Sequence, residues 1–277
     1  MTIPRSTLLA LLCVGPVAGG HGTGCGWGDD DAAAAAAPAR SATGSRPVVL
    51  VELFTSQGCS SCPPADQLLG QLPGAVDGIE VLPLAFHVDY WNDLGWSDPF
   101  SRAEWTARQK RYVDALADGR IYTPQLVVQG SADVVGSDRR AAVGLIRRAA
   151  SRTASPERAR IQANVSARPA GLTVVVDAAL GARRDDSPAR ADVWVALVES
   201  GLTTPVKRGE NEGRSLVNHF VVRRLTRAFE LEAGASRRGD VTLALEPGWR
   251  SDRLAVTVFL QDRDRHHVLA AAAARPR

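Results

Sequence analysis

Methionine, lysine and cysteine are scarce in this chain of 277 residues, and their scarcity limits the classes of function that the chain can have. The single methionine is the initiator, so a methionine-rich metal-binding surface is excluded. Arginine supplies nearly all of the 33 basic residues, which are interspersed with 30 acids to give a net charge of +3. So small and scattered an excess is not typical of nucleic-acid-binding proteins, and no nucleic-acid partner is expected.

Cysteine occurs four times, with Cys13 and Cys25 near the N-terminus and Cys59 and Cys62 as the only pair beyond residue 46. A zinc site made of cysteines alone needs a second pair, so no zinc site is expected. The sequence indicates no resident cofactor.

Long apolar runs are also missing. Beyond residue 46 none approaches the roughly 20 residues that span a bilayer, so no stable membrane span is expected in the mature protein. Residues 1–20 combine Arg5, an apolar stretch and the small residues Ala18 and Gly19, a pattern typical of a cleaved signal peptide. An uncleaved membrane anchor is the alternative. We therefore expect a secreted or periplasmic protein.

Residues 21–46 are rich in Gly, Ala, Asp and Ser. They cannot bury enough apolar surface to fold, which predicts a flexible tether. Cys25 follows small residues, as a lipoprotein cysteine does, but the usual aliphatic residue three positions upstream is missing. A secreted protein with a stray tether cysteine is therefore favoured over a lipoprotein.

Hydrophobic periodicity between residues 47 and 152 predicts alternating strands and helices. Apolar runs predict strands over 47–55 and 79–88, and Pro83 in the second indicates an edge strand or a bulge. Helices are expected over 65–72, 101–117 and 139–150, and a hairpin over 125–135. The resulting order, β-α-β-α-β-β-α, is that of the thioredoxin fold.

A polar stretch over 151–158 ends this pattern, and apolar residues alternate with polar ones in several segments beyond it. Period-two strands separated by Gly, Pro and Asp are typical of an antiparallel β-sandwich. Residues 209–213, GENEG, are expected to form a solvent-exposed turn. The expected fold is an α/β thioredoxin-like N-terminal domain over residues 47–152 followed by an all-β antiparallel sandwich domain over residues 158–277.

The Cys59-Ser60-Ser61-Cys62 motif can close a small disulfide after the first strand. Near a helix N-terminus, backbone N–H groups and the helix dipole stabilise a thiolate at Cys59. That thiolate can attack a substrate disulfide, and Cys62 can then resolve the mixed disulfide. The motif therefore predicts redox catalysis, and a purely structural disulfide in an exported protein is the alternative.

Pro63 and Pro64 directly follow the motif and weaken the helix-dipole argument. Each disfavours the α conformation in the residue before it, yet proline is tolerated in the first turn of a helix. The helix is expected to begin at Pro63 or Pro64, with Cys62 at or before its N-cap and Cys59 farther away.

Two further residues are candidates for the same chemistry. Pro124 stands before the third strand, where a thioredoxin fold has a cis-proline facing the dithiol, and Thr123 then offers its backbone to a substrate peptide. Glu52 is a lone carboxylate in a buried strand, so burial would raise its pKa and allow it to accept a proton from the resolving thiol. A solvent-facing Glu52 is the alternative.

The loop over residues 87–96 concentrates polar and aromatic groups after a strand, and Trp91 and Trp96 are candidates for binding a substrate peptide. A plain packing loop is equally compatible with the sequence. His87 together with the two cysteines is similar to the ligand sets of copper-handling proteins, because thiolates and imidazole suit copper.

Four segments resemble a known family: VELFTSQGCSSCPPAD (51–66), HVDYWNDLGWSDPF (87–100), YTPQ (122–125) and VKRGENEGRSLVNHFVVRRL (206–225). They are similar to the bacterial secreted family catalogued as domain of unknown function 1223, from about residue 47 to the C-terminus. The resemblance implies a thioredoxin-like fold and places Cys59 and Cys62 on the family's CxxC and Thr123-Pro124 on its TP element. It implies no established activity.

These observations predict an exported thiol–disulfide oxidoreductase that acts on extracytoplasmic protein thiols or disulfides. A non-catalytic binding protein with a structural disulfide and a copper-handling protein are the alternatives.

Overall fold

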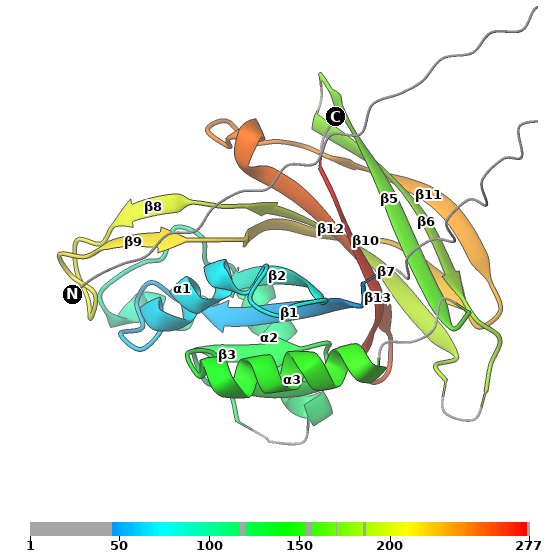
Figure 1. Ribbon diagram of the computed structural model, residues 1–277. Coiled ribbons are helices and arrows are strands. Elements are labelled where there is room, and N and C mark those ends of the chain that lie inside the picture. The colour runs from blue at the N-terminus through cyan, green and yellow to red at the C-terminus, as the bar shows by residue number, and fades with distance from the viewer. Residues whose placement is uncertain (1–45, 117–119, 153–156, 170, 185–186, 276–277) are drawn as a thin grey trace, which may run out of the picture. The chain divides into compact units, whose positions relative to one another are not determined.

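The computed structural model describes residues 46–116, 120–152, 157–169, 171–184 and 187–275. The expected signal peptide, the tether and Cys25 lie outside these ranges. Within them, thirteen strands are accompanied by three α-helices and two short 3-10 helices (Figure 1). The described part of the chain is therefore mostly β.

The elements begin and end as follows. In the first half they are β1 (Val48–Thr55), α1 (Pro63–Gln71), β2 (Glu80–His87), η1 (Asn92–Leu94), α2 (Ala103–Leu116), β3 (Gln125–Val128), β4 (Ala132–Val135) and α3 (Arg139–Arg152). In the second half they are β5 (Ala159–Arg168), β6 (Gly171–Leu180), β7 (Arg190–Glu199), β8 (Leu202–Pro205), β9 (Ser215–Asn218), β10 (Val221–Glu232), β11 (Ser236–Leu243), η2 (Ser251–Arg253), β12 (Leu254–Asp262) and β13 (Val268–Ala274).

One mixed sheet of eight strands runs through both halves, in the order β13-β12-β7-β10-β2-β1-β3-β4. The halves join where β10 pairs in parallel with β2, through Val221 opposite Ala85, and the Ala85 N–H donates to the Phe220 carbonyl at 2.8 Å. The expectation of an α/β thioredoxin-like domain followed by a separate β-sandwich is therefore wrong. Periodicity correctly indicates strands but does not reveal which strands are neighbours. Here β1 pairs with one edge of β2, and β10, a strand of the second half, pairs with the other edge.

Three apolar cores surround this sheet. Val49, Val51 and Leu53 of β1 face α1 and α3, whereas Leu50 and Phe54 face α2. The α2-side core also contains Val198, Val222 and Phe259 from the second half, so that core belongs to both halves. The third core lies between the three-stranded sheet β11-β6-β5 and strands β7, β10 and β12.

Pro83 lies in a central strand, not at an edge as its residue type indicates. It sits opposite Val51 of β1, and β2 also pairs with β10. The Ala85 N–H points toward β10, and so would an N–H at residue 83, because alternate residues of a strand donate to the same side. Since β10 pairs with β2 only through Ala85, the missing N–H of Pro83 interrupts no ladder.

A buried ion pair links the strands to α2. The Arg108 Nε of α2 donates to Glu52 Oε2 of β1 at 2.6 Å, and both side chains are at most 3% exposed. The guanidinium carbon lies 5.3–5.9 Å from the centroids of four aromatic rings, those of Phe86, Tyr112, Trp194 and Phe259. The Tyr112 hydroxyl also donates to Glu52, and Gln261 Nε2 of β12 donates to that hydroxyl at 2.8 Å.

Opposite effects act on the pKa of Arg108. Burial lowers the pKa, but the adjacent Glu52 carboxylate raises it by more than burial lowers it. The pKa of Arg108 therefore lies above its usual value, and the guanidinium stays charged. Each charge is thus compensated by the other within the apolar core, and removing one partner leaves an uncompensated buried charge.

We therefore expect Arg108→Met to lower the free energy of unfolding by about 3–5 kcal/mol at pH 7, measured by urea denaturation. The exposed pair Arg250–Asp252, at 3.0 Å, provides the control. Arg250→Met should change stability by no more than about 0.5 kcal/mol. Adding Glu52→Gln to Arg108→Met should restore part of the loss, and an Arg108→Met effect as small as the control would contradict this account.

Candidate functional site

Cys59 and Cys62 form a disulfide across the turn between β1 and α1. The Cys59 N–H donates to the Ser56 carbonyl and the Cys62 N–H to the Cys59 carbonyl, both at 3.2 Å. Helix α1 begins at Pro63 with Cys62 as its N-cap, which confirms the helix start expected from the two prolines. Both cysteines are completely buried, while Ser60 and Ser61 between them are exposed.

Thr123 and Trp91 lie beside the disulfide. The Thr123–Pro124 peptide bond is cis, as expected, and the Thr123 carbonyl oxygen is 4.0 Å from Cys59 Sγ. The Trp91 indole N–H donates to the Thr123 hydroxyl at 2.9 Å. The Ser61 hydroxyl lies 3.3 Å from Cys59 Sγ and is the donor, because a disulfide sulfur carries no hydrogen. The structure thus brings together Cys59, Thr123 and Trp91, three residues singled out in the sequence.

A loop from the second half of the chain, residues 206–214, holds the turn that carries Cys59. The Asn211 side-chain amide donates to the carbonyls of Gln57 and Cys59, each at 2.9 Å, and Asn211 is 1% exposed. The Glu210 carboxylate accepts the Ser60 N–H at 2.8 Å, and hydrogen bonds from the Ser60 hydroxyl and N–H lower the pKa of Glu210. The expectation that residues 209–213 form only a solvent-exposed turn is wrong for Asn211.

Gln57 connects this turn to the loop between η1 and α2 and to the end of β9. Its N–H donates to Asp98 Oδ2 and its side-chain amide to Asn218 Oδ1, both at 2.8 Å. The Trp96 indole N–H donates to Gln57 Oε1 at 3.1 Å. Trp96 therefore binds the side chain of Gln57, two residues before Cys59, whereas Trp91 binds the side chain of Thr123, whose carbonyl lies beside Cys59.

Two glycines allow the loops around residues 95 and 209 to approach each other. Gly95 and Gly209 have φ values of +105° and +80°, which side-chain-bearing residues rarely adopt. A Cβ at Gly95 would lie 3.3 Å from the Gly209 Cα, and one at Gly209 would lie 3.2 Å from the Trp96 Cβ. Ser60, Ser61 and the loop over 206–214 form the cover of the disulfide. This cover therefore depends on close backbone packing between segments that are far apart in sequence.

A buried group of ionisable side chains lies in the elements that flank the turn. His87, at the end of β2, donates from Nδ1 to Asp98 Oδ2 at 2.7 Å with both side chains fully buried. Burial lowers the pKa of His87, but Asp98 raises it above its usual value overall. Burial raises the pKa of Asp98, but His87 lowers it below its usual value overall. The two therefore form an ion pair.

Asp66 completes the group and titrates near neutrality. It is 4% exposed, and its N–H donates to the Cys62 carbonyl at 3.0 Å, which places it one helical turn beyond Cys62. Burial raises its pKa to about 7, against the opposing effect of His87. A carboxyl group with such a pKa can both donate and accept a proton at physiological pH.

The sequence profile of the family described as "Protein of unknown function (DUF1223)" matches residues 50–261. The chain belongs to this family. The match contains the Cys59–Cys62 turn, Thr123-Pro124 and the loop over 206–214, so every part of the site described above lies within the region that defines the family.

Solved structures provide a second comparison. A crystal structure of an Agrobacterium tumefaciens protein is 27% identical with a TM-score of 0.63, over 82% of this chain and 93% of that one. A domain of the outer membrane lipoprotein Omp28 from Porphyromonas gingivalis is 12% identical with a TM-score of 0.25, over 44% of this chain and 93% of that domain. The Agrobacterium protein shares the fold of this chain, whereas the similarity to the Omp28 domain is too weak to support any argument. No curated protein matches the chain.

Glu52 is the one proposed catalytic residue that the structure places elsewhere. It shares the face of β1 that carries Leu50 and Phe54, toward α2, whereas α1 packs on the opposite face. Its carboxylate is held by Arg108 and Tyr112. The Glu52 carboxylate is thus bound on the α2 side of the sheet, and Asp66 is an ionisable group on the α1 side.

Sequence analysis missed Asp66, Asp98, Glu210 and Asn211. Asp66 lies in the first turn of a helix, where an acid is ordinarily explained by the helix dipole. Asn211 stands between two glutamates, and such a sequence is typical of a solvent-exposed segment. The one available signal was that all four lie in segments that resemble the family.

Two further searches of the described residues complete the description. No group of three or more His, Cys, Asp or Glu side chains in these ranges is placed to hold a metal ion. Among the same residues, no helix has the length and apolar character needed to cross a membrane.

The raised pKa of Asp66 predicts a pH dependence of stability. Its pKa is about 7 in the folded protein against 3.8 for an ordinary aspartate, so folding favours the protonated form. The resulting stabilisation is complete below pH 3.8 and is lost as the pH rises through 7, because ionisation must then occur inside the protein. Between pH 5 and pH 8 this effect lowers the free energy of unfolding by roughly 2–3 kcal/mol.

Asp66→Asn should remove this effect, so the variant should gain stability relative to the unmodified protein between pH 5 and pH 8 in urea unfolding of the oxidised form. The exposed Asp77 on the loop after α1 provides the control, and Asp77→Asn should follow the unmodified protein at both pH values. Parallel pH profiles for Asp66→Asn and the unmodified protein would contradict a raised pKa at Asp66.

Proposed function

We propose that this protein is an extracytoplasmic thiol–disulfide oxidoreductase that acts on protein cysteines. The observation that carries the proposal is the arrangement at Cys59. Its sulfur is bonded to Cys62 at a helix N-cap, lies 4.0 Å from the Thr123 carbonyl and is adjacent to the exposed residues Ser60 and Ser61. The signal-peptide pattern of residues 1–20 supports action outside the cytoplasm.

Exchange proceeds in two balanced steps. A substrate thiolate attacks Cys59 Sγ, a bond forms between the two sulfurs, and the Cys59–Cys62 bond breaks with its electron pair passing to Cys62. A second substrate thiolate then attacks the substrate sulfur of the mixed disulfide and releases Cys59 as a thiolate. The substrate leaves as a disulfide and the protein as a dithiol, and the reverse sequence reduces a substrate disulfide.

Three groups support these steps. The Ser61 hydroxyl, 3.3 Å from Cys59 Sγ, can donate to a thiolate there. The Thr123 backbone beside Cys59 is positioned to pair with an incoming extended peptide. Asp66, one helical turn beyond Cys62 and with a pKa of about 7, can protonate the thiolate that leaves at Cys62.

The complete burial of both cysteines adds one requirement. A substrate sulfur reaches Cys59 only after the cover formed by Ser60, Ser61 and the loop over 206–214 has shifted. The hydrogen bonds from Asn211 and to Glu210 oppose this shift, so they set how readily the disulfide reacts.

The decisive experiment is the equilibrium of the mature protein with glutathione, combined with oxidation of a reduced, unfolded secretory protein. We expect a potential between about −120 and −270 mV, the range of thiol–disulfide catalysts. Cys59→Ser should abolish exchange, Cys62→Ser should accumulate a mixed disulfide through Cys59, and Ser236→Ala, at an exposed position of β11, serves as the control with the dithiol intact. A potential below about −300 mV without exchange would instead identify a structural disulfide.

A second prediction concerns the cover. In the reduced Cys62→Ser protein, Glu210→Gln removes a negative charge beside Cys59, so alkylation of Cys59 by iodoacetamide at pH 7 should be roughly threefold faster. Asn211→Ala should accelerate it further by freeing the turn. Glu212→Gln makes the same charge change in the same loop and should leave the rate unchanged, and equal effects of Glu210→Gln and Glu212→Gln would argue against a specific role for Glu210.

A further inference from the structure

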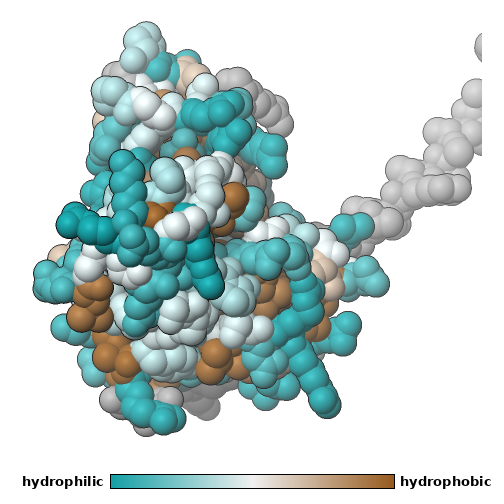
Figure 2. Space-filling model, turned by 90° about the vertical axis from the view of Figure 1, so that its left-hand side faces the viewer, coloured by the Kyte–Doolittle hydropathy of each residue, from teal (hydrophilic) through white to brown (hydrophobic). Residues whose placement is uncertain are grey.

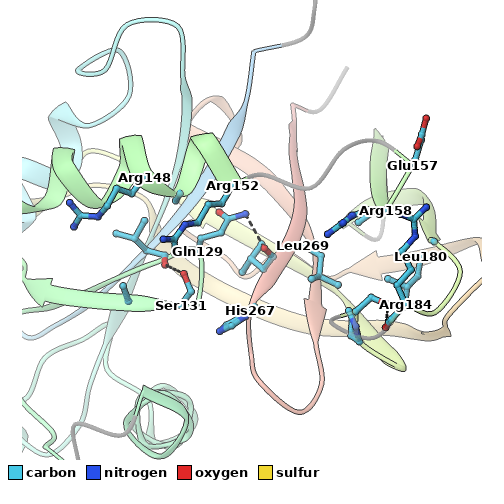
Figure 3. Close-up of a pocket in the computed structure, with 18 of the residues that line it drawn as sticks. Gln129, Ser131, Arg148, Arg152, Glu157, Arg158, Leu180, Arg184, His267 and Leu269 are labelled. Carbon is cyan, nitrogen blue, oxygen red and sulfur yellow. Dashed lines mark hydrogen bonds between the residues drawn. The ribbon is translucent and has the colours of Figure 1, made fainter.

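A cavity of about 680 Å³ lies where α3 and the β3–β4 hairpin meet β5, β6 and β13 (Figure 3). It is remote from the disulfide along β1. Gln129 at the cavity accepts the N–H of Leu50 near the start of this strand at 2.9 Å, whereas the disulfide follows its last residue, Thr55. The volume falls within the range of roughly 300–1,000 Å³ that is typical of small-molecule sites.

The inner wall of the cavity is apolar. It is formed by buried and half-buried side chains from β3, α3, β6 and β13, namely Val128, Leu145, Ala149, Leu180, Val268 and Leu269. The polar group among them, Gln129, is already satisfied, because it accepts from Leu50 and donates to the Val268 carbonyl at 3.0 Å. The wall therefore favours an apolar ligand body and requires no further hydrogen bond from it.

The rim is cationic. Four of the residues that line the cavity are arginines, Arg148, Arg152, Arg158 and Arg184, against the single carboxylate of Glu157. In Figure 3, Arg152 reaches from α3 and Arg158 extends toward it from the opposite wall, while the Glu157 side chain points away. Arg148 and Arg152 are four residues apart on α3, so they lie on one side of that helix.

We propose that this cavity binds an amphipathic carboxylate, with its apolar body against the inner wall and its carboxylate at Arg148 and Arg152. Guanidinium groups bind carboxylates with paired, charge-assisted hydrogen bonds, and a bound anion relieves the repulsion between cations along one helix face. A neutral apolar ligand forms no charge-assisted hydrogen bond with Arg148 or Arg152, and a small anion leaves the apolar wall in contact with water.

Calorimetric titration of the oxidised mature protein with dodecanoate, below its micelle concentration, tests the proposal. We expect one site per chain, at least tenfold weaker binding of hexanoate and at least tenfold weaker binding of the neutral analogue dodecanol. Absence of dodecanoate binding, or equal affinity for dodecanoate and dodecanol, would overturn the proposal.

Matched variants locate the site. Arg148→Gln with Arg152→Gln should weaken dodecanoate binding at least tenfold, as loss of charge-assisted hydrogen bonds predicts. The control, Arg140→Gln with Arg147→Gln, makes the same charge change at exposed positions of α3 that do not line the cavity, and it should bind as the unmodified protein does. If both double variants weakened dodecanoate binding equally, the effect would be general electrostatic attraction, and the proposed site would be refuted.

The binding measurement does not depend on the proposed redox activity. A protein with Cys59→Ser and Cys62→Ser should still bind dodecanoate with unchanged affinity, because the disulfide lies beyond the other end of β1. Failure of exchange and failure of binding are therefore separate outcomes.

Discussion

The buried pair of Arg108 and Glu52 ties the two halves of this protein together. Its anion belongs to β1, its cation to α2, and the aromatic rings around the guanidinium come from β2, α2, β7 and β12. Because an unpaired charge is so unfavourable in an apolar core, β1, α2 and the C-terminal strands must all be in place for any of them to be stable there. The parallel contact of β10 with β2 is short, so this shared core carries much of the connection.

The candidate site rests on that connection. The turn that bears Cys59 is supplied by the first half of the chain, but the donor to its carbonyls, Asn211, is supplied by the second. The same end of the protein is seen in Figure 2, where hydrophobic residues of the visible surface form small separate patches among hydrophilic ones. A buried disulfide under a polar cover of this kind is reached by local movement of loops, not through an open groove.

Much of the local structure could be predicted from the sequence, and much of the long-range structure could not. The order of elements over 47–152 and the start of α1 at Pro63 follow from local patterns and were found, whereas the cis bond before Pro124 was expected from its place in a thioredoxin-like order of elements. The pairing of β10 with β2 joins segments about 135 residues apart, and no local pattern specifies it. The partners of Glu52 could not be predicted, because a strand buried on both sides shows no alternation to say which of its residues face α1 and which face α2.

The hydrogen bonds from Asn211 also bear on how the protein matures. They span 152 and 154 residues of chain, and contacts of such high contact order form late because loop closure must precede them. During synthesis, Cys59 and Cys62 emerge long before residue 211. The dithiol is therefore open to oxidants in the nascent chain and becomes covered only when the final strands have assembled, so the oxidation state set early in maturation is the one that the folded protein retains until its cover moves.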